Sequence, residues 1–282
     1  MRIEAYAKVN LTLEVFGVRG DGYHALRSIV APVSLSDTIE IEPADGLSSD
    51  TGYDDDLALR AARALDPAAG ASIRVEKRIP AGGGLGGGSA DAAAVLLALN
   101  ELRALGRSPE ELAEVGAAVG SDVPALVLAQ SYRTMVVMEG RGERTTPVRF
   151  GGRTPGPLHL VLANPGVHTS TREVYARSVP RAEGAPSATE RCLEALAAGD
   201  IGAISESFAN DLEAAALALH PETARAMEAL RAEGARGVAM SGSGSTSFGI
   251  VESQSRAQEI ARALRARGLD AWAVHTLCQD MV

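Results

Sequence analysis

A chain of 282 residues, 46% of them hydrophobic, is long enough to bury a large core, and this excludes an intrinsically disordered protein. The formal net charge of −9 and the lack of basic clusters argue against a nucleic-acid partner and against a membrane-surface partner. The sequence has only two cysteines, Cys192 and Cys278, no CxxC pair, and no apolar segment of signal-peptide or membrane-span length. We therefore expect a soluble, cytoplasmic protein. For its assembly, a monomer or a weak homodimer is expected.

The first half of the chain alternates strand patterns with helix patterns. Helices are predicted over residues 57–65, with an acidic N-cap from the aspartates at 54–56, and over 89–105. Two more helices are predicted to open at Ser108 and at Asp122. Strands are predicted over six segments, 2–9, 11–18, 24–33, 37–42, 71–79 and 132–138.

The second half begins after a segment dense in glycine and proline, residues 151–157, which is the best linker candidate. We therefore predict an N-terminal domain of residues 1–153 and a C-terminal domain of residues 154–282. Four or five helices are predicted between residues 170 and 233, and another over 255–267. Strands are predicted over 158–163, 237–240, 246–251 and 271–277. Strands and helices interleave in both halves, so an α/β or α+β fold is expected.

A run of glycines is the most informative feature of the sequence. Residues 80–89 read PAGGGLGGGS, and they lie between a strand rich in β-branched residues and a strong helix that Ser89 is expected to cap. Backbone without side chains lets N–H groups converge on an anion, and the start of a helix adds partial positive charge. A flexible linker is the alternative, but linkers do not usually join a strand directly to a capped helix. The run therefore predicts a phosphate-binding loop of an ATP-dependent small-molecule kinase.

Three better-known phosphate-binding loops fit this run less well. The Walker A pattern needs a lysine where Gly88 stands. The dinucleotide-binding pattern GxGxxG is present as Gly82, Gly84 and Gly87, but a second helix follows the first one where a strand should follow. The protein-kinase loop requires a strand after it and HRD and DFG motifs later, and the sequence contains neither motif.

The whole run resembles the second motif of the GHMP small-molecule kinases, a superfamily that includes galactokinase, homoserine kinase and mevalonate kinase. Residues 5–11 resemble its first motif, with Tyr6 in place of the usual proline, and residues 240–245 resemble its third motif. The resemblance implies a two-domain α+β fold: an N-terminal domain like domain 2 of ribosomal protein S5 and a ferredoxin-like C-terminal domain. It also implies an active site in the cleft between the domains, with ATP and Mg²⁺ as cofactors.

Four further segments narrow the resemblance to the 4-diphosphocytidyl-2-C-methylerythritol kinases, one family of that superfamily. Its RxDGYHxL, GADVP, PGV and NDxE segments are similar to residues 19–26, 120–124, 164–175 and 210–213. The matches cover nearly the whole chain. The resemblance implies transfer of the γ-phosphate of ATP to the 2-hydroxyl of a small substrate that carries cytidine diphosphate. This reaction belongs to the non-mevalonate (MEP) pathway of isoprenoid biosynthesis.

The same resemblance implies two catalytic residues. Asp122 would act as the general base or orient the substrate hydroxyl, and Lys8 would keep Asp122 ionised and help neutralise the transferring phosphoryl group. Lys8 and Lys77 are the only lysines among 27 basic residues, as if lysine were kept where a compact ammonium group is needed. A helix N-cap for Asp122 and a solvated strand end for Lys8 are the structural alternatives.

The remaining implied roles concern the two ligands. Tyr23 and Tyr175 would sandwich the cytosine, His24 would hydrogen-bond its edge, and Asn10 and Thr171 would contact the methylerythritol end. The nucleotide is expected to lie on the glycine loop, the helix start after it and an aspartate–leucine pair near adenine. These residues are Pro80, Gly82, Gly83, Gly84, Leu85, Gly86, Gly87, Gly88, Ser89, Ala90, Asp56 and Leu57.

No metal-binding residue is predicted. The histidines other than His24 show no metal-ligand spacing and are interpreted as surface or packing residues. Asp91 is interpreted first as favouring the start of its helix, and a position near Mg²⁺ is the alternative. Two other functions stay open: a GHMP kinase for another alcohol, such as homoserine, a sugar or mevalonate, and a catalytically silent ATP-binding module of the same fold. The presence of both Lys8 and Asp122 argues against the silent module.

Overall fold

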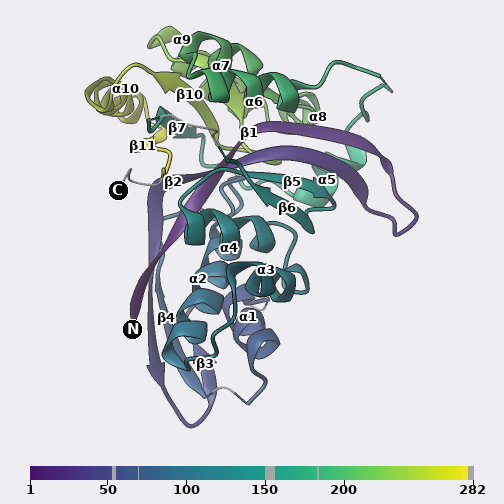
Figure 1. Cartoon of the computed structure of the whole chain (residues 1–282). Coiled ribbons are helices and arrows are strands. Elements are labelled where there is room, and N and C mark those ends of the chain that lie inside the picture. Colours follow the sequence, from purple (N-terminus) through teal and green to yellow (C-terminus); the bar gives the residue numbers. More distant parts are fainter. Residues whose placement is uncertain (53–54, 69, 150–155, 183, 279–282) are drawn as a thin grey trace.

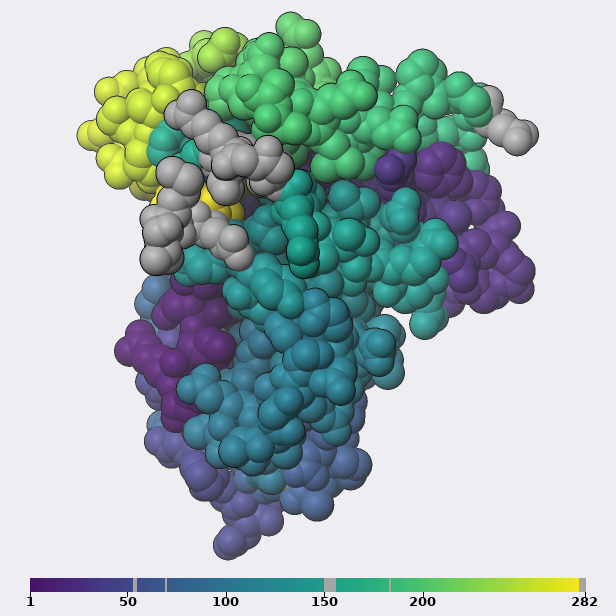
Figure 2. Space-filling view, in the orientation of Figure 1, coloured from purple at the N-terminus to yellow at the C-terminus, as the bar shows by residue number. Residues whose placement is uncertain are grey.

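Two long antiparallel strands form the frame of the molecule. The computed structural model describes residues 1–52, 55–68, 70–149, 156–182 and 184–278. In it, β1 (Arg2–Val18) pairs with β2 (His24–Pro43) along almost its whole length. Their hairpin extends far to one side of the molecule (Figure 1). On the face shown in Figure 2 the two halves of the chain form one continuous body, with this hairpin at its edge.

The N-terminal sheet is built outward from β2. Its order is β3–β4–β2–β1–β8, and β5 also pairs with β2 and carries β6. The added strands are β3 (Leu47–Ser49), β4 (Ala71–Glu76), β5 (Val136–Gly140), β6 (Arg144–Pro147) and β8 (Ala209–Asn210). β2 can hold two partners on the same side because β4 pairs with its end, from Thr38, while β5 pairs with its beginning, up to Val30.

Four helices cover this sheet: α1 (Leu57–Leu65), α2 (Gly87–Leu102), α3 (Pro109–Ala117) and α4 (Val123–Tyr132). The residues of α2 and α4 are mostly apolar, and most of them are buried between the sheet and the outer helices α1 and α3. A helix that is apolar on nearly every face is expected to lie inside a domain, and these two do.

The C-terminal sheet consists of β7 (His159–Asn164), β9 (Arg236–Met240), β10 (Ser247–Val251) and β11 (Asp270–His275). Its order is β11–β7–β10–β9, and every neighbouring pair is antiparallel. Numbered within this domain, the strands lie in the order 4-1-3-2, the split β-α-β arrangement of a ferredoxin-like fold, as predicted. The helices of this half are α5 (Thr171–Arg177), α6 (Ala188–Ala198), α7 (Ile201–Ser207), α8 (Glu213–Leu219), α9 (Pro221–Ala232) and α10 (Gln254–Ala266).

The two halves share a core and exchange a strand. β8 comes from the C-terminal half but pairs in parallel with β1 at Thr12 and Leu13. One cluster of buried hydrophobic residues also runs from the N-terminal strands and helices into β7 and β10. The predicted boundary between residues 153 and 154 lies outside the described residues, and so does most of the predicted linker 151–157. No helix in the described part of the chain is long and apolar enough to cross a membrane.

Several predicted elements are confirmed with nearly the predicted bounds. α1 has the predicted span, and the Asp56 carboxylate accepts hydrogen bonds from two backbone N–H groups of its first turn. α3 begins with the full capping box of Ser108 and Glu111, with Pro109 at its first position. The four strands of the C-terminal sheet and α10 lie within one or two residues of their predictions, and five helices lie in the described part of residues 170–233.

Other predictions about the elements were wrong. β1 is one strand across Asn10, because neighbouring side chains satisfy the buried Asn10 amide, and β2 is continuous where two strands were predicted. The second helix starts at Gly87, after Gly86 as N-cap, so Ser89 is not its cap. Tyr132 ends α4, and the next strand starts only at Val136. The short strands β3, β6 and β8 were not predicted, since each has four residues or fewer.

Candidate active site

One cavity of about 1310 Å³ lies where the glycine loop, β1, the tip of the β1–β2 hairpin and the start of α5 meet. It brings together all the predicted site residues except Leu85 and Ala90. Those two side chains are buried in the core, at 1% and 0% exposure. Five of the others mark the extent of the cavity: Lys8, Tyr23, Ser89, Asp122 and Tyr175.

The glycine loop has a backbone that other residues rarely adopt. Gly82, Gly84 and Gly86 have φ values of 64°, 76° and 70°. A Cβ atom on Gly84 would lie 2.1 Å from the carbonyl oxygen of Ser241, in the loop before β10. Glycine is therefore required here both by the left-handed backbone and by the close approach of a second backbone segment.

Backbone carbonyl oxygens of this loop accept hydrogen bonds from other segments of the chain. The carbonyl oxygens of residues 82–85 accept, in order, from the N–H of Thr169 at 3.3 Å, the N–H of Thr246 at 3.1 Å, the hydroxyl of Ser241 at 2.9 Å and the N–H of Lys8 at 3.0 Å. The first and third motifs therefore hold the second in place. Because these carbonyls are engaged, the loop can turn its N–H groups toward an anion.

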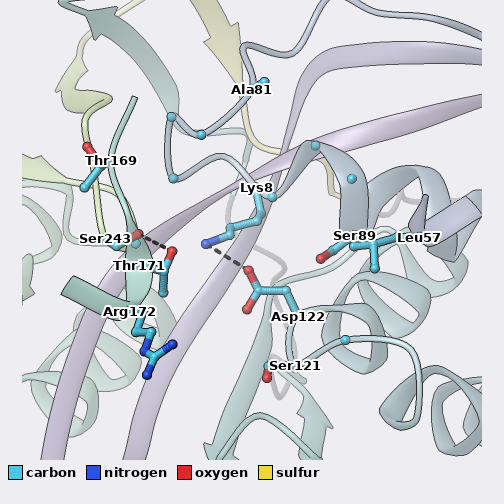
Figure 3. Close-up of a pocket in the computed structure, with 18 of the residues that line it drawn as sticks. Lys8, Leu57, Ala81, Ser89, Ser121, Asp122, Thr169, Thr171, Arg172 and Ser243 are labelled. Carbon is cyan, nitrogen blue, oxygen red and sulfur yellow. Dashed lines mark hydrogen bonds and ion pairs between the residues drawn. The ribbon is translucent and has the colours of Figure 1, made fainter. Parts of the chain in front are cut away.

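Lys8 and Asp122 meet on the wall of the cavity. The Lys8 ammonium nitrogen lies 3.3 Å from an Asp122 carboxylate oxygen, and only 3% of Lys8 is exposed (Figure 3). The same ammonium group donates to the Asn10 side-chain oxygen at 2.6 Å, and the Asn10 amide donates to the Ser28 hydroxyl at 2.8 Å. Asp122 stands at the N-cap position of α4, but its side chain makes no capping hydrogen bond. Its carboxylate faces Lys8 instead.

The opposite wall contains the aromatic residues predicted for a base. The rings of His24 and Tyr175 are 5.5 Å apart and tilted by 37°. Burial, followed by the nearby negative charge of Asp122, raises the pKa of the Tyr175 hydroxyl, so this group stays protonated. Tyr23 is 54% exposed, and the Arg141 guanidinium lies 5.6 Å from its ring centroid.

One hydrogen bond decides the tautomer of His24. Its Nδ1 atom lies 3.3 Å from the carbonyl oxygen of Phe16. A carbonyl oxygen can only accept, so this bond requires the proton on Nδ1. In the neutral ring Nε2 is then an acceptor.

Thr171 marks the end of this wall nearest to the Lys8–Asp122 pair. Its hydroxyl lies 2.8 Å from the hydroxyl of Ser243, in the loop of the third motif. A Cβ atom on Gly242, next to Ser243, would lie 3.2 Å from the Lys8 ammonium nitrogen. The third motif therefore connects α5 to the Lys8–Asp122 pair.

Sequence reasoning missed an acidic cluster beside the glycine loop. The Lys77 ammonium group lies 2.6 Å from Asp37 and 2.7 Å from Asp91, and both carboxyl groups are almost fully buried. Burial opposes the charge of Lys77, but the two carboxylates raise its pKa. Burial raises the pKa of Asp91 to about 7 despite the nearby ammonium group. Asp91 was predicted to favour the start of its helix, and this prediction was wrong. The helix starts at Gly87, so Asp91 lies beyond its first turn. The scarcity of lysine in the sequence was the signal that could have pointed to a special role for Lys77.

His168 was also missed, because it was interpreted as a surface or packing residue. It lines the cavity, and a Cβ atom on Gly82 would lie 2.1 Å from its ring. Thr169, beside it, is 4% exposed and has a hydroxyl without a hydrogen-bond partner among the described residues. No pattern in the sequence connected these two residues with the glycine loop.

The oxygen donors near the loop suit a hard cation. The Ser89 hydroxyl and the Asp91 carboxyl group both line the cavity, and one Asp91 oxygen has no hydrogen-bond partner among the described residues. Across the described ranges, no group of three or more His, Cys, Asp and Glu residues could hold a metal ion. This donor set fits Mg²⁺, which keeps much of its hydration and binds mainly through substrate phosphates.

Comparison with known proteins identifies the class. Residues 56–130 match the model of the GHMP kinases N terminal domain, and residues 192–270 match that of the GHMP kinases C terminal domain. A homoserine kinase from Cytophaga hutchinsonii shares the fold, with a TM-score of 0.74 at 20% identity over 99% of this chain and 96% of that one. The matches to both family models, in a fold of this kind, show that the chain is a GHMP kinase.

Closer relatives narrow the class. The 4-diphosphocytidyl-2-C-methyl-D-erythritol kinase of Symbiobacterium thermophilum is 42% identical over 98% of this chain and 100% of that protein. The enzyme of the same name from Geobacillus thermodenitrificans is 39% identical over 98% and 97%. A crystal structure of 4-(cytidine 5'-diphospho)-2C-methyl-D-erythritol kinase matches with a TM-score of 0.82 and 40% identity, over 98% of this chain and 99% of that one. The chain therefore belongs to the 4-diphosphocytidyl-2-C-methyl-D-erythritol kinase family of the GHMP kinases.

Proposed function

We propose that this protein transfers the γ-phosphate of ATP to the 2-hydroxyl of 4-diphosphocytidyl-2-C-methyl-D-erythritol, a step of isoprenoid biosynthesis. The observation that carries the proposal is the Lys8–Asp122 pair, at 3.3 Å, between the glycine loop and the wall of His24 and Tyr175. A donor nucleotide on the loop and an acceptor nucleotide on that wall would meet at this pair. The family membership supports the same assignment of ligands.

Asp122 accepts the hydrogen bond of the acceptor hydroxyl and takes up its proton as the phosphoryl group is transferred. Phosphoryl transfer depends on alignment and on neutralisation of charge more than on a strong base, so a carboxylate is adequate. Lys8 stabilises the ionised carboxylate and the charge that develops on the transferring oxygens. The buried hydrogen bonds from Lys8 to Asn10 and from Asn10 to Ser28 hold the ammonium group in place. Thr171 and Asn10 then lie where the polyol end of the acceptor would be.

The donor nucleotide lies along the glycine loop, with its phosphates on the N–H groups of residues 82–89. The adenine end is directed toward Asp56 and Leu57, which line the same cavity. Mg²⁺ would be held by the ATP phosphates with the Ser89 hydroxyl and, on losing its proton, the Asp91 carboxyl group. When bound, the ion would neutralise phosphate charge. Asp56 also accepts two backbone N–H groups of α1, so one of its oxygens is committed to that helix.

The cytosine of the acceptor lies against Tyr175 and is covered by Tyr23. His24 would distinguish cytosine from uracil, because its Nε2 acceptor matches the amino donor of cytosine and opposes the carbonyl acceptor of uracil. The neutral Tyr175 hydroxyl introduces no negative charge next to an anionic ligand.

The test is an ADP-release assay with Mg·ATP and a panel of acceptors: 4-diphosphocytidyl-2-C-methyl-D-erythritol, homoserine, galactose and mevalonate. We expect turnover with the first acceptor only. Asp122→Asn and Lys8→Ala should each lower kcat by at least 100-fold and leave ATP binding largely intact. Glu259→Gln, an exposed change on α10, serves as control. Turnover of another acceptor alone would show a different GHMP kinase. ATP binding without transfer to any acceptor would indicate the silent module, and full activity of Asp122→Asn would refute the mechanism.

A further inference from the structure

The cationic side chains of the cavity differ in whether they already have a partner. Lysine and arginine contribute Lys8, Arg60, Lys77, Arg141 and Arg172 to the described wall. The first three form ion pairs with carboxylates at 3.3 Å or less. Arg141 lies over the Tyr23 ring. Only Arg172 has no ion pair, side-chain hydrogen bond or ring contact with any residue that the structure describes.

Arg172 lies between the two ends of the acceptor site. It follows Thr171, whose hydroxyl contacts Ser243 in the loop next to Lys8. It also precedes Tyr175 by three residues in α5, so the two side chains share one face of the helix. Figure 3 shows its guanidinium group beside Thr171, across the cavity from Asp122. Its place is thus between the residues of the reacting hydroxyl and those of the base.

The chemical groups of the acceptor follow the same order as these residues. A cytidine diphosphate acceptor carries its reacting polyol at one end, its base at the other and a diphosphate between them. The glycine loop supplies donors for the phosphates of ATP, but it lies on the other side of the reacting groups. In a chain with a net charge of −9, a second diphosphate needs a local cation. Arginine suits it because the planar guanidinium can donate two parallel hydrogen bonds to phosphate oxygens.

We propose that Arg172 binds the diphosphate of the acceptor, and that it thereby makes the enzyme select acceptors that carry a nucleoside diphosphate. This inference rests on the proposed function. Arg172 contacts no reacting atom, so its role is to bind and position the acceptor. Its removal should therefore weaken acceptor binding and leave the use of ATP unchanged.

The experiment compares Arg172→Ala with Arg177→Ala. Arg177 is an exposed arginine on the same helix that does not line the cavity, so it matches the change in charge and helix propensity. Hydrogen bonds to charged groups contribute about 1.5–3 kcal/mol, which corresponds to roughly a 10- to 100-fold change in KM. For Arg172→Ala we expect this increase in the KM for the acceptor, with the KM for ATP and the kcat within about threefold of wild type. Arg177→Ala should behave as wild type.

A binding measurement tests selectivity without turnover. Calorimetric titration with cytidine, CMP and CDP should show that the wild type prefers CDP over cytidine, and Arg172→Ala should lose most of that preference while its affinity for cytidine stays unchanged. Arg172→Lys keeps the charge but cannot donate two parallel hydrogen bonds, so its preference for CDP should be intermediate. This variant also replaces the alanine variant if that one fails to fold. If both substitutions leave the CDP preference and the acceptor KM unchanged, Arg172 does not bind the diphosphate. A rise in the KM for ATP instead would assign it to the donor nucleotide and would equally overturn the inference.

The same titration separates this inference from the proposed function. If the wild type neither binds CDP nor phosphorylates the acceptor, the proposed function is wrong. If it does both, and Arg172→Ala does both equally well, only the role of Arg172 is wrong.

Discussion

Gly84→Ala should destabilise the protein and inactivate it, because Gly84 lies where the three GHMP motifs meet. Its φ of 76° costs an alanine about 1–2 kcal/mol. The new Cβ atom would also lie 2.1 Å from the Ser241 carbonyl oxygen and 3.0 Å from that of Gly244, and neither can rotate away because both are backbone atoms. Forced overlap in a packed region adds about 1–3 kcal/mol, so we expect a loss of about 2–5 kcal/mol in the free energy of unfolding.

Gly88→Ala is the matched control for stability. Gly88 lies inside α2, and a Cβ atom there would meet Leu57 at 3.5 Å, an ordinary van der Waals contact. Because alanine favours a helix over glycine by about 1 kcal/mol, this variant should be as stable as the wild type or more stable. Urea unfolding followed by circular dichroism at 222 nm measures both variants, and ADP release measures activity. The reasoning is refuted if Gly84→Ala unfolds within about 0.5 kcal/mol of wild type, or if Gly88→Ala loses as much as Gly84→Ala.

Three further predictions concern single side chains. Burial raises the pKa of Asp91 to about 7, so between about pH 4 and 7 the native state binds more protons than the unfolded chain, and stability falls as pH rises. Asp91→Asn should flatten this dependence in urea titrations, and an unchanged slope would contradict it. The Asn210 side-chain amide donates at 2.8 Å to the carbonyl oxygens of Met240 and Gly242. Asn210→Asp should therefore lower the free energy of unfolding in urea by about 2–4 kcal/mol and lower kcat. Wild-type values of both would show that these bonds do not hold the third motif. Tyr175→Phe should keep the acceptor KM within about twofold and Tyr175→Leu should raise it about 3- to 10-fold, whereas equal KM values would exclude stacking on this ring.

The features that depend on neighbours in the chain were well predicted. Asp56 and Ser108 cap their helices as expected, because a cap needs only a side chain and the N–H groups two or three residues later. The glycine run was predicted to form a loop of side-chain-free backbone before a helix, and three of its glycines have φ between 64° and 76°, where other residues are strained. The resemblance implied a ferredoxin-like C-terminal domain, and the strand order 4-1-3-2 agrees with it.

The wrong predictions concern residues whose environment is set by distant parts of the chain. Asn10 separates two predicted strands, yet it is buried within β1 because Lys8 and Ser28 satisfy its amide. Ser89 was expected to cap α2, but the left-handed backbone of Gly86 starts the helix earlier, and the Ser89 side chain is left to line the cavity. In both cases the local pattern was compatible with two structures, and tertiary contacts selected one of them.

The sequence by itself determined the class of the protein and many of the residues that line the site, because motif spacing and capping are short-range properties. Only the tertiary structure decided what the key side chains contact. Asp122 could have capped α4, but its carboxylate faces Lys8, which lies more than a hundred residues earlier in the chain. Only the folded protein showed the ion pairs of Lys77 with Asp37 and Asp91, and the lack of a partner for Arg172 among the residues that the structure describes. The physical reason is that a buried polar group must find partners, and which partners it finds depends on how the whole chain packs.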